Sequence, residues 1–301
     1  MQSLTESTAK NQTFAGLIHD LKEITKFGLS LSVVFSALAG YLLAVEHINI
    51  TILLSLAVGG YFMVGASNVF NQVIEREPDK LMKRTRNRPL PAGRMSITTA
   101  LILGTSLTIF GLAILYSINP RTAMFGAISI VIYTSIYTPL KPVTPLVVFV
   151  GAFPGAIPFM LGWVAATGKF GIEPGILFMI QFFWQFPHFW AIGWLLHDEY
   201  QKAGFNMLPT GEKNSKATIQ IMLYTIWMII VSVFPVLKIT GNLYLSPIAA
   251  FLVFVLGLIM LYYAYLLHKN QTNAYARKLM LASVFYITLI QVIYVTDKFL
   301  H

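Results

Sequence analysis

Three oxygen-bearing side chains, Asn71, Glu75 and Asp79, lie four residues apart at the end of an apolar stretch. On a helix, positions i, i+4 and i+8 share one face. Amide and carboxylate oxygens in a row suit a hard cation such as Mg²⁺, which keeps waters or phosphate oxygens as its other ligands. The spacing therefore predicts a magnesium site on a helix that continues the apolar stretch. Pro78 predicts a kink between Glu75 and Asp79, because proline cannot donate the helical hydrogen bond.

Basic residues follow these acids directly along the chain. They lie between positions 76 and 94, and they are Arg76, Lys80, Lys83, Arg84, Arg86, Arg88 and Arg94. Arginine binds phosphate oxygens in bidentate fashion, so Arg84 and Arg88 are candidate diphosphate ligands. Carboxylates alone repel a diphosphate, whereas carboxylates with magnesium and arginine bind one. The plainer interpretation, surface ion pairs on a basic loop, fits the charges as well, but the ordered spacing on one face favours a site.

A second group of polar residues lies within another apolar stretch, in the sequence FFWQFPHFWAIGWLL that starts at Phe182. Polar side chains inside a membrane helix are costly and commonly face a cavity or a partner. Trp184 and His188 would give a flat aromatic ligand a ring wall and an imidazole. The plainer interpretation is a histidine hydrogen-bonded to a neighbouring helix, with aromatic residues that pack or anchor the helix at the interface.

The composition indicates a membrane protein. Of the 301 residues, 56% are hydrophobic and 11% are charged, whereas soluble domains carry about 25% charged residues. Apolar runs of about 20 residues recur, enough to cross a hydrocarbon core as helices. Cysteine is absent, which excludes disulfides and thiolate metal sites. The sequence therefore predicts an all-α, polytopic membrane protein.

Nine transmembrane helices can be placed along the chain. The predicted spans are Phe27–Val45, Ile50–Phe70, Ile97–Tyr116, Ala123–Thr138, Val143–Ala165, Gly175–Leu196, Ile219–Leu237, Ser246–Leu267 and Leu279–Val295. Residues 27–301 form this domain. Residues 1–26 form a cytoplasmic segment whose apolar residues from Phe14 to Ile24 have the spacing of an amphipathic helix on the membrane surface. We expect no cleavable signal peptide, because these residues are polar and include acids.

The Lys and Arg residues predict the orientation. With the N-terminus in the cytoplasm, 17 of the 21 Lys and Arg fall in segments on the inside. The four on the outside are Arg121, Lys169, Lys238 and Lys298. We expect a bacterial-type inner (plasma) membrane protein with its C-terminus outside. The net charge of +9 is then mostly that of the inside face, and it implies no nucleic acid partner.

Two acidic loops hold half of the twelve Asp and Glu residues. They are Glu75, Glu77 and Asp79 after the second span, and Asp198, Glu199 and Glu212 after the sixth. Four spans separate the loops, so both are expected on the same side of the membrane. The repeat suggests two related halves.

Four motifs carry a resemblance to a known family. They are NxxxExxxDxxMxRTxxRPL at residues 71–90, YTPLK at 137–141, WQFPHF at 184–189 and DEYxKAGFxMLP at 198–209. The chain resembles, over roughly residues 20–300, the protoheme IX farnesyltransferase (heme O synthase) branch of the intramembrane aromatic prenyltransferases. That resemblance implies nine helices around a large cavity, and transfer of a farnesyl group from farnesyl diphosphate to the 2-vinyl group of heme B, giving heme O.

The resemblance also implies roles for individual residues. The first metal–diphosphate motif falls on Asn71, Glu75 and Asp79, and the second on Asp198 and Glu199. The remaining roles are Mg²⁺ binding by Glu75, Asp79 and Asp198, diphosphate binding by Arg84, Arg88 and Lys202, and heme binding by His188 and Trp184. Other members have DxxxD in the second motif, where this sequence has Leu196 and Tyr200, so the number of metal ions stays open.

Two other functions stay open. One is prenylation of another aromatic acceptor, such as a quinone precursor. The other is heme transport, because glycine and proline in GAFPGAIP at residues 151–158 are typical of discontinuous transporter helices. They are also typical of a helix bent around a cavity. Expected partners besides the two substrates are the lipid bilayer and, downstream, heme A synthase or terminal oxidase assembly.

Overall fold

The computed structural model describes residues 14–301, and within that range the chain consists of helices and their connections. The long helices are α2 (Phe27–Ala44), α3 (Ile50–Ile74), α5 (Ile97–Ile118), α6 (Pro120–Val131), α8 (Val147–Thr167), α9 (Ile172–Leu195), α11 (Ser215–Val233), α12 (Pro247–Asn270) and α13 (Asn273–Leu300). The short ones are α1 (Phe14–Ile24), α4 (Arg76–Leu81), α7 (Thr138–Leu140) and α10 (His197–Lys202). A π-helix (Ile132–Tyr137) joins α6 to α7, and a 3-10 helix (Phe234–Leu237) follows α11. The all-α class is confirmed.

Eight helices of the described range are long and apolar enough to span a membrane. The sixth predicted span corresponds to α9, which has 24 residues and is not among the eight. Its sequence explains this, because it contains glutamines, a histidine and three tryptophans. The prediction of nine spans is therefore confirmed for eight helices, and for α9 it stays a prediction.

Several helix ends differ from the predicted spans. The fifth helix begins at Val147 rather than Val143, because Pro142 and Pro145 have no N–H for a helical hydrogen bond and the chain turns there. The ninth helix extends from Asn273 to Leu300, beyond the apolar core of the predicted span. The helix continues at both ends into segments that contain charged residues, which hydropathy alone does not assign to the span.

Side-chain caps fix where five of the long helices begin. Each cap accepts a hydrogen bond from a backbone N–H of the first turn, as polar N-cap residues do. The caps are Asn49, Ser96, Asn119, Asn214 and Ser246. The sequence therefore marks these starts locally, independently of the packing that follows.

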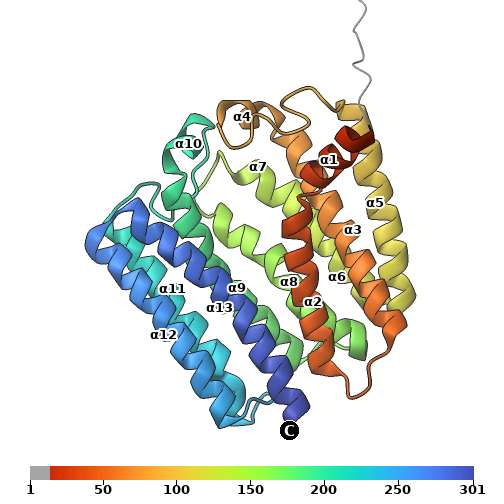
Figure 1. Ribbon diagram of the computed structural model, residues 1–301, viewed down its shortest axis with the longest axis vertical. Coiled ribbons are helices and arrows are strands. Elements are labelled where there is room, and N and C mark those ends of the chain that lie inside the picture. Colours follow the sequence, from red (N-terminus) through yellow and green to blue (C-terminus); the bar gives the residue numbers. More distant parts are fainter. Residues whose placement is uncertain (1–13) are drawn as a thin grey trace, which may run out of the picture.

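Four helices form a closed circuit in the middle of the bundle: α2 packs on α8, α8 on α9, α9 on α13, and α13 on α2. On one side α3, α5 and α6 cover α2 and α8, and on the other α11 and α12 cover α9 and α13 (Figure 1). Glycines let α2 and α8 approach closely. A Cβ on Gly162 would lie 1.9 Å from the carbonyl oxygen of Ala37, which is a typical role for small residues between membrane helices.

A buried polar network joins the helices of this circuit. The Gln291 amide donates to Ser36 Oγ at 3.0 Å and to Gln181 Oε1 at 3.3 Å. Gln185 donates to the carbonyl oxygen of Ala152 at 2.9 Å. Residues from α2, α8, α9 and α13 therefore satisfy one another inside the apolar bundle, which explains why α9 can carry amides there.

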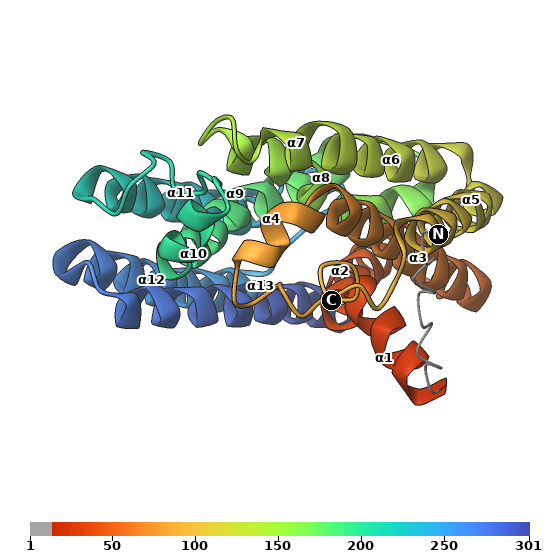
Figure 2. The same ribbon diagram turned by 90° about the horizontal axis from the view of Figure 1, so that it is seen from above.

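Helix α1 projects outward from the bundle, at an angle to the long helices (Figure 2). Its Phe14, Leu17 and Ile18 side chains are exposed, whereas Ile24 is buried. This distribution fits an amphipathic helix on a membrane surface.

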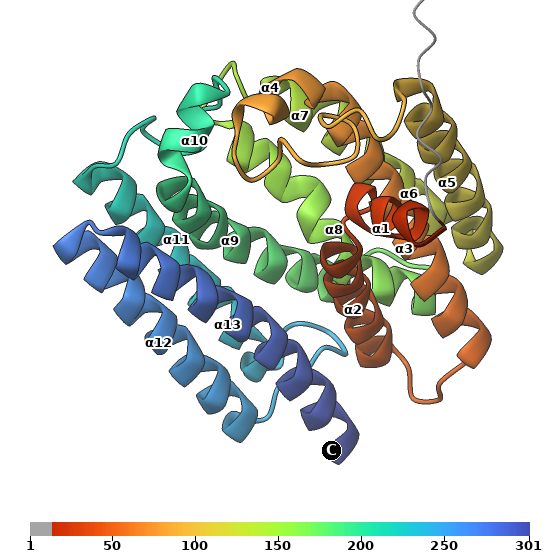
Figure 3. The ribbon, with the colours of Figure 1, turned by 45° about the horizontal axis from the view of Figure 1, so that its top comes forward.

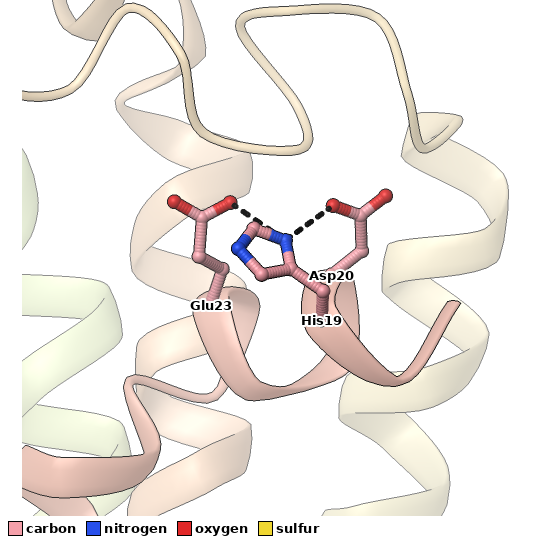
Figure 4. A group of neighbouring side chains, drawn as sticks. All are labelled: His19, Asp20 and Glu23. Carbon is pink, nitrogen blue, oxygen red and sulfur yellow. Dashed lines mark ion pairs between the residues drawn. The ribbon is translucent and has the colours of Figure 1, made fainter. Parts of the chain in front are cut away.

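Ion pairs fix α1 to the connection between α4 and α5. Arg94 Nε lies 2.9 Å from Asp20 Oδ1, and Arg94 Nη2 lies 2.7 Å from Glu23 Oε2. His19 lies beside the same two carboxylates, 3.6 Å from Asp20 and 3.9 Å from Glu23 (Figure 4). Because Arg94 forms ion pairs with both acids, this group holds α1 to the connection.

Candidate active site

The helices α4 and α10 lie side by side at one end of the bundle, with α7 close by (Figure 3). The two acidic loops are therefore on the same side, as predicted. The C-terminus lies at the opposite end (Figure 1).

The first acidic corner is formed where α3 ends and α4 begins. The break is at Glu75, whose φ and ψ are −90° and 11°. Pro78 explains its position, because a proline ring clashes with the carbonyl of the residue four before it, here Ile74, the last residue of α3. The hydrogen bonds nevertheless continue, from Glu75 N–H to the Asn71 carbonyl and from Asp79 N–H to the Glu75 carbonyl.

Because the helical hydrogen bonds continue through the break, the three predicted residues share one face. Asn71, Glu75 and Asp79 are all buried, with 1%, 5% and 1% of their surface exposed. Their shared face is thus confirmed, together with the expected kink. Three buried polar groups in an apolar protein need partners, and the partners define the site.

Asp79 is paired with Arg88. Arg88 Nη1 lies 2.8 Å from Asp79 Oδ2, and Thr85 Oγ1 donates to the Asp79 carbonyl at 2.7 Å. Burial raises the pKa of Asp79, although Arg88 opposes that shift. The other carboxylate oxygen, Oδ1, is buried without a hydrogen-bond partner among residues 14–301. A buried carboxylate oxygen with a free lone pair suits a metal ion, so this residue fits the predicted magnesium ligand.

Glu75 is paired with Lys141, a residue to which the sequence assigned no role. Lys141 Nζ lies 2.5 Å from Glu75 Oε1, and both side chains are nearly buried. The ammonium also lies 4.8 Å from the Tyr137 ring centre and 5.6 Å from that of Phe205. Lys141 ends the YTPLK motif, so the motif itself was the signal that could have identified it.

A second lysine outside the predicted set, Lys26, faces Asn71. Its Nζ lies 3.4 Å from Asn71 Oδ1, and Asn71 Nδ2 donates to Thr138 Oγ1 at 3.2 Å. Burial, together with the cations Arg88 and Lys141, lowers the pKa of Lys26 to about 7. Lys26 therefore adds an amine to the cluster whose protonation depends on burial and on the neighbouring cations.

The backbone at Lys26 is held in a left-handed conformation, with φ 47° and ψ 58°, which is costly for a residue other than glycine. Two amides of α3 hold the preceding residues in place. Gln72 Nε2 donates to the Ile24 carbonyl at 2.7 Å, and Asn68 Nδ2 donates to the Thr25 carbonyl at 3.2 Å. Helix α3 thus positions the lysine that faces its own Asn71.

The second acidic corner has the same backbone as the first. α9 ends at Leu195, and the break is at Leu196, with φ −101° and ψ 13°. Helical hydrogen bonds again pass through it, from Leu196 N–H to the Ile192 carbonyl and from Tyr200 N–H to the Leu196 carbonyl. Leu196 and Tyr200 therefore stand in the register of Glu75 and Asp79, as the sequence alignment indicated.

The acids of the second corner lie elsewhere on α10. Asp198 is exposed and stands in the register of Glu77. Glu199 Oε2 accepts the Lys83 backbone N–H at 2.6 Å, and Lys202 Nζ lies 3.1 Å from Glu199 Oε1. These two contacts, the backbone bond first, lower the pKa of Glu199. Glu199 thus joins the two loops, and metal binding by Asp198 stays a prediction.

The remaining predicted phosphate ligands differ in their placement. Arg88 is part of the buried cluster, whereas Arg84 and Lys202 are exposed and their phosphate binding stays a prediction.

The two predicted heme contacts lie in α9. His188 Nδ1 lies 2.7 Å from Ser283 Oγ of α13. The Trp184 ring stacks on the His188 ring, with centres 4.6 Å apart. The structure thus brings the two predicted heme contacts together.

A small, mostly apolar cavity of about 40 Å³ lies beside α3, toward the first corner. Its α3 lining includes Ser67, one turn before Asn71, and Gly60 further along the helix. Residues of α2, α5, α6 and α8 complete it, among them Val34, Leu115 and Ile157. The cavity lies in the first half of the bundle.

The chain is similar to known proteins over most of its length. Residues 33–290 match the model of the UbiA prenyltransferase family. A protoheme IX farnesyltransferase from Christiangramia forsetii is 61% identical over 98% of each chain. Another from Flavobacterium psychrophilum is 63% identical over 94% of this chain and 96% of the relative.

Solved structures show the same fold. A digeranylgeranylglyceryl phosphate synthase structure superposes with a TM-score of 0.76 at 20% identity, covering 93% of this chain and 98% of the other. A UbiA homolog from Archaeoglobus fulgidus bound to GPP and Mg²⁺ has a TM-score of 0.65 at 14% identity, covering 92% and 99%. At such low identities these likenesses establish the fold alone.

Proposed function

The chain belongs to the UbiA prenyltransferase family, and from this premise we propose that it transfers the farnesyl group of farnesyl diphosphate to the 2-vinyl group of heme B, with addition of water, to give heme O. The names of the relatives at 61% and 63% identity support these substrates. The structural observation that carries the proposal is the buried cluster of acids and cations at one end of an apolar helical bundle. Together they fit a molecule with a diphosphate head and an isoprenoid tail.

The first corner binds the diphosphate together with a divalent metal ion, which we take to be Mg²⁺. Glu75 and Asp79 hold the metal, with Asn71 beside them, and the free Oδ1 of Asp79 supports this assignment. When bound, the metal neutralises charge that develops on the departing diphosphate. Arg88 and Lys141 supply fixed positive charge in the same buried cluster.

One metal ion at the first corner is sufficient for this chemistry. The second corner places Leu196 and Tyr200 where the first has Glu75 and Asp79, and neither leucine nor a neutral tyrosine suits Mg²⁺. Lys26 and Lys141 supply cationic groups that can partly take the place of a second metal. Glu199 contributes by accepting the Lys83 backbone N–H. Lys83 lies in the segment between Asp79 and Arg88, so this hydrogen bond holds the segment that carries the buried ion pair.

The reaction proceeds by ionisation. The allylic C–O bond breaks, and its electron pair leaves with the diphosphate. The terminal vinyl carbon of heme attacks the farnesyl cation, and water adds to the porphyrin-stabilised cation and loses a proton. The apolar interior of the bundle beneath Asn71 holds the farnesyl tail, and aromatic faces such as Trp184 stabilise passing positive charge. His188 and Trp184 contact the heme.

We also propose that α1 and the two acidic corners lie on the cytoplasmic side and the C-terminus outside. The excess of Lys and Arg on the connections at the α4–α10 end supports this orientation. An alkaline phosphatase fused after His301 is expected to be active, and a green fluorescent protein at the same place to be dark. The opposite pair of results would contradict the orientation.

Incubating the purified protein in detergent with heme B, farnesyl diphosphate and Mg²⁺ tests the function. We expect a product with the mass of heme O, which EDTA should abolish. Geranyl diphosphate and a quinone precursor serve as alternative donor and acceptor. Turnover only with the quinone precursor would replace the acceptor in the proposal, and no turnover with any combination would refute the proposed activity.

A further inference from the structure

The Ser283 hydroxyl on α13 lies between two possible hydrogen-bond partners. Its oxygen is 2.6 Å from the Met280 carbonyl oxygen and 2.7 Å from His188 Nδ1. A serine hydroxyl has one proton to donate, and a carbonyl oxygen can only accept. Two oxygens 2.6 Å apart would repel without a proton between them, so the hydroxyl donates to Met280.

The direction of this bond determines the tautomer of His188. Because the Ser283 proton is used by the Met280 carbonyl, Ser283 Oγ can only accept from His188, and Nδ1 must carry the hydrogen. In a neutral imidazole the other nitrogen, Nε2, then has a lone pair. Ser283 is fully buried, so water does not compete for its hydroxyl.

The same serine also fixes the plane of the imidazole. Trp184 Nε1 donates to the Ser283 backbone carbonyl at 2.7 Å, and the indole stacks on the His188 ring with an interplanar angle of 18°. The Phe189 ring meets the imidazole edge-on, with centres 5.3 Å apart. Both the tautomer and the orientation of His188 are therefore set by its neighbours.

We propose that His188 Nε2 is an axial ligand of the iron in the heme substrate, and that Ser283 is the positioning residue that keeps Nδ1 protonated. A neutral imidazole whose second nitrogen donates to a fixed acceptor is the usual form of a metal-ligating histidine. His188 lies seven residues before the end of α9, about 10 Å along the helix. This inference rests on heme being the acceptor, as proposed above.

A second histidine provides a matched control. Thr218 Oγ1 donates to the Ser215 carbonyl at 2.9 Å and lies 2.8 Å from His268 Nδ1. These two hydrogen bonds have the same pattern as those between His188, Ser283 and Met280. His268, however, is next to Lys269 near the end of α12, away from α9. Replacement of His268 or Thr218 should therefore leave heme binding unchanged.

The experiment titrates the purified full-length protein with hemin and, separately, with metal-free protoporphyrin IX. His188→Gly should weaken hemin binding about tenfold or more and shift the Soret band, whereas protoporphyrin IX affinity should stay within about twofold because it has no iron. Added imidazole should restore the Soret position in His188→Gly. Wild-type hemin spectra in the variant, or equal loss for both porphyrins without imidazole rescue, would overturn the proposal.

Ser283 is tested in the same titrations. Ser283→Ala should weaken hemin binding less than His188→Gly, and Ser283→Thr, which keeps the hydroxyl, should restore it. His268→Ala and Thr218→Ala should match the wild type. Equal effects in the His268 variant would refute the assignment. A histidine-ligated heme spectrum without heme O formation would leave the ligation intact and refute the proposed activity instead, so the two failures are distinguishable.

Discussion

The two acidic corners have the same backbone but use their side chains differently. In both, a long helix breaks at a residue with φ near −95° and ψ near 12° (−90° and 11° at Glu75, −101° and 13° at Leu196), and a six-residue helix follows. In the first corner Glu75 and Asp79 stand on the buried face, paired with Lys141 and Arg88. In the second, that face carries Leu196 and Tyr200, and the acids point elsewhere.

This difference shows that acid content alone does not define a metal site. Asp79 has a buried oxygen without a partner among residues 14–301, whereas both oxygens of Glu199 are occupied by Lys83 N–H and Lys202. A shift of one residue along a helix turns a side chain by about 100°. Glu199 is one residue away from the register of Asp79, and it becomes a link between loops.

The largest expected effect is from Asp79→Asn. The change keeps the volume but removes the charge that we assign to metal binding, so turnover should fall at least about 100-fold while the protein stays folded in the membrane. Glu75→Gln should behave similarly. Turnover measured by heme O formation across a Mg²⁺ series checks this, and near-wild-type activity with normal Mg²⁺ dependence would remove either residue from the metal site.

Lys141→Met should act through both stability and turnover. It leaves Glu75 as an unpaired buried carboxylate, and breaking a buried ion pair costs about 3–5 kcal/mol. Thermal unfolding in detergent should show a lower midpoint, and turnover should fall. The double variant Glu75→Gln/Lys141→Met is the control, since it removes both charges and should recover most of the stability but not the activity. An unchanged midpoint in the single variant would contradict the pairing.

A smaller effect is expected from Glu199→Gln. An amide accepts the Lys83 N–H more weakly than a carboxylate does, so the loop between α4 and α5 should loosen. The Lys83 amide should exchange its hydrogen faster, and the KM for farnesyl diphosphate should rise several-fold with little change in kcat. An effect as large as that of Asp79→Asn, with altered Mg²⁺ affinity, would instead make Glu199 a metal ligand.

The smallest effect should be that of Asp198→Asn. Its side chain is exposed and stands in the register of Glu77 rather than of a buried acid. We expect kcat and the Mg²⁺ requirement to change by about twofold or less, as for most surface substitutions. A large rise in the Mg²⁺ requirement would show that the second corner binds metal, and it would confirm the prediction made from the sequence.

Much of the fold could be predicted from the sequence because hydropathy and helical spacing are local signals. The spans, the shared face of Asn71, Glu75 and Asp79, and the kink at Pro78 all follow from residues close together in the chain. The partners do not. Lys141 reaches Glu75 from 66 positions away, and Lys26 reaches Asn71 from 45, so only the packed bundle identifies them.

The end of the sixth span, predicted at Leu196, agrees with the structure, in which α9 ends at Leu195 and α10 begins at His197 after the break. No proline or glycine marks this break, in contrast to the first corner. The sequence offered no local reason for it, and the analogy between the two halves was the one available signal.

The network around Gln291 has a consequence for biogenesis. Its bond to Ser36 joins positions 255 residues apart, whereas the contacts around Lys26 join segments fewer than 50 residues apart. Contacts that are close in sequence form early, and distant ones wait for the rest of the chain. The α1–α2–α3 unit can therefore assemble while translation continues. The central circuit closes only after α13 has been inserted, so the last helix made is the one that completes it.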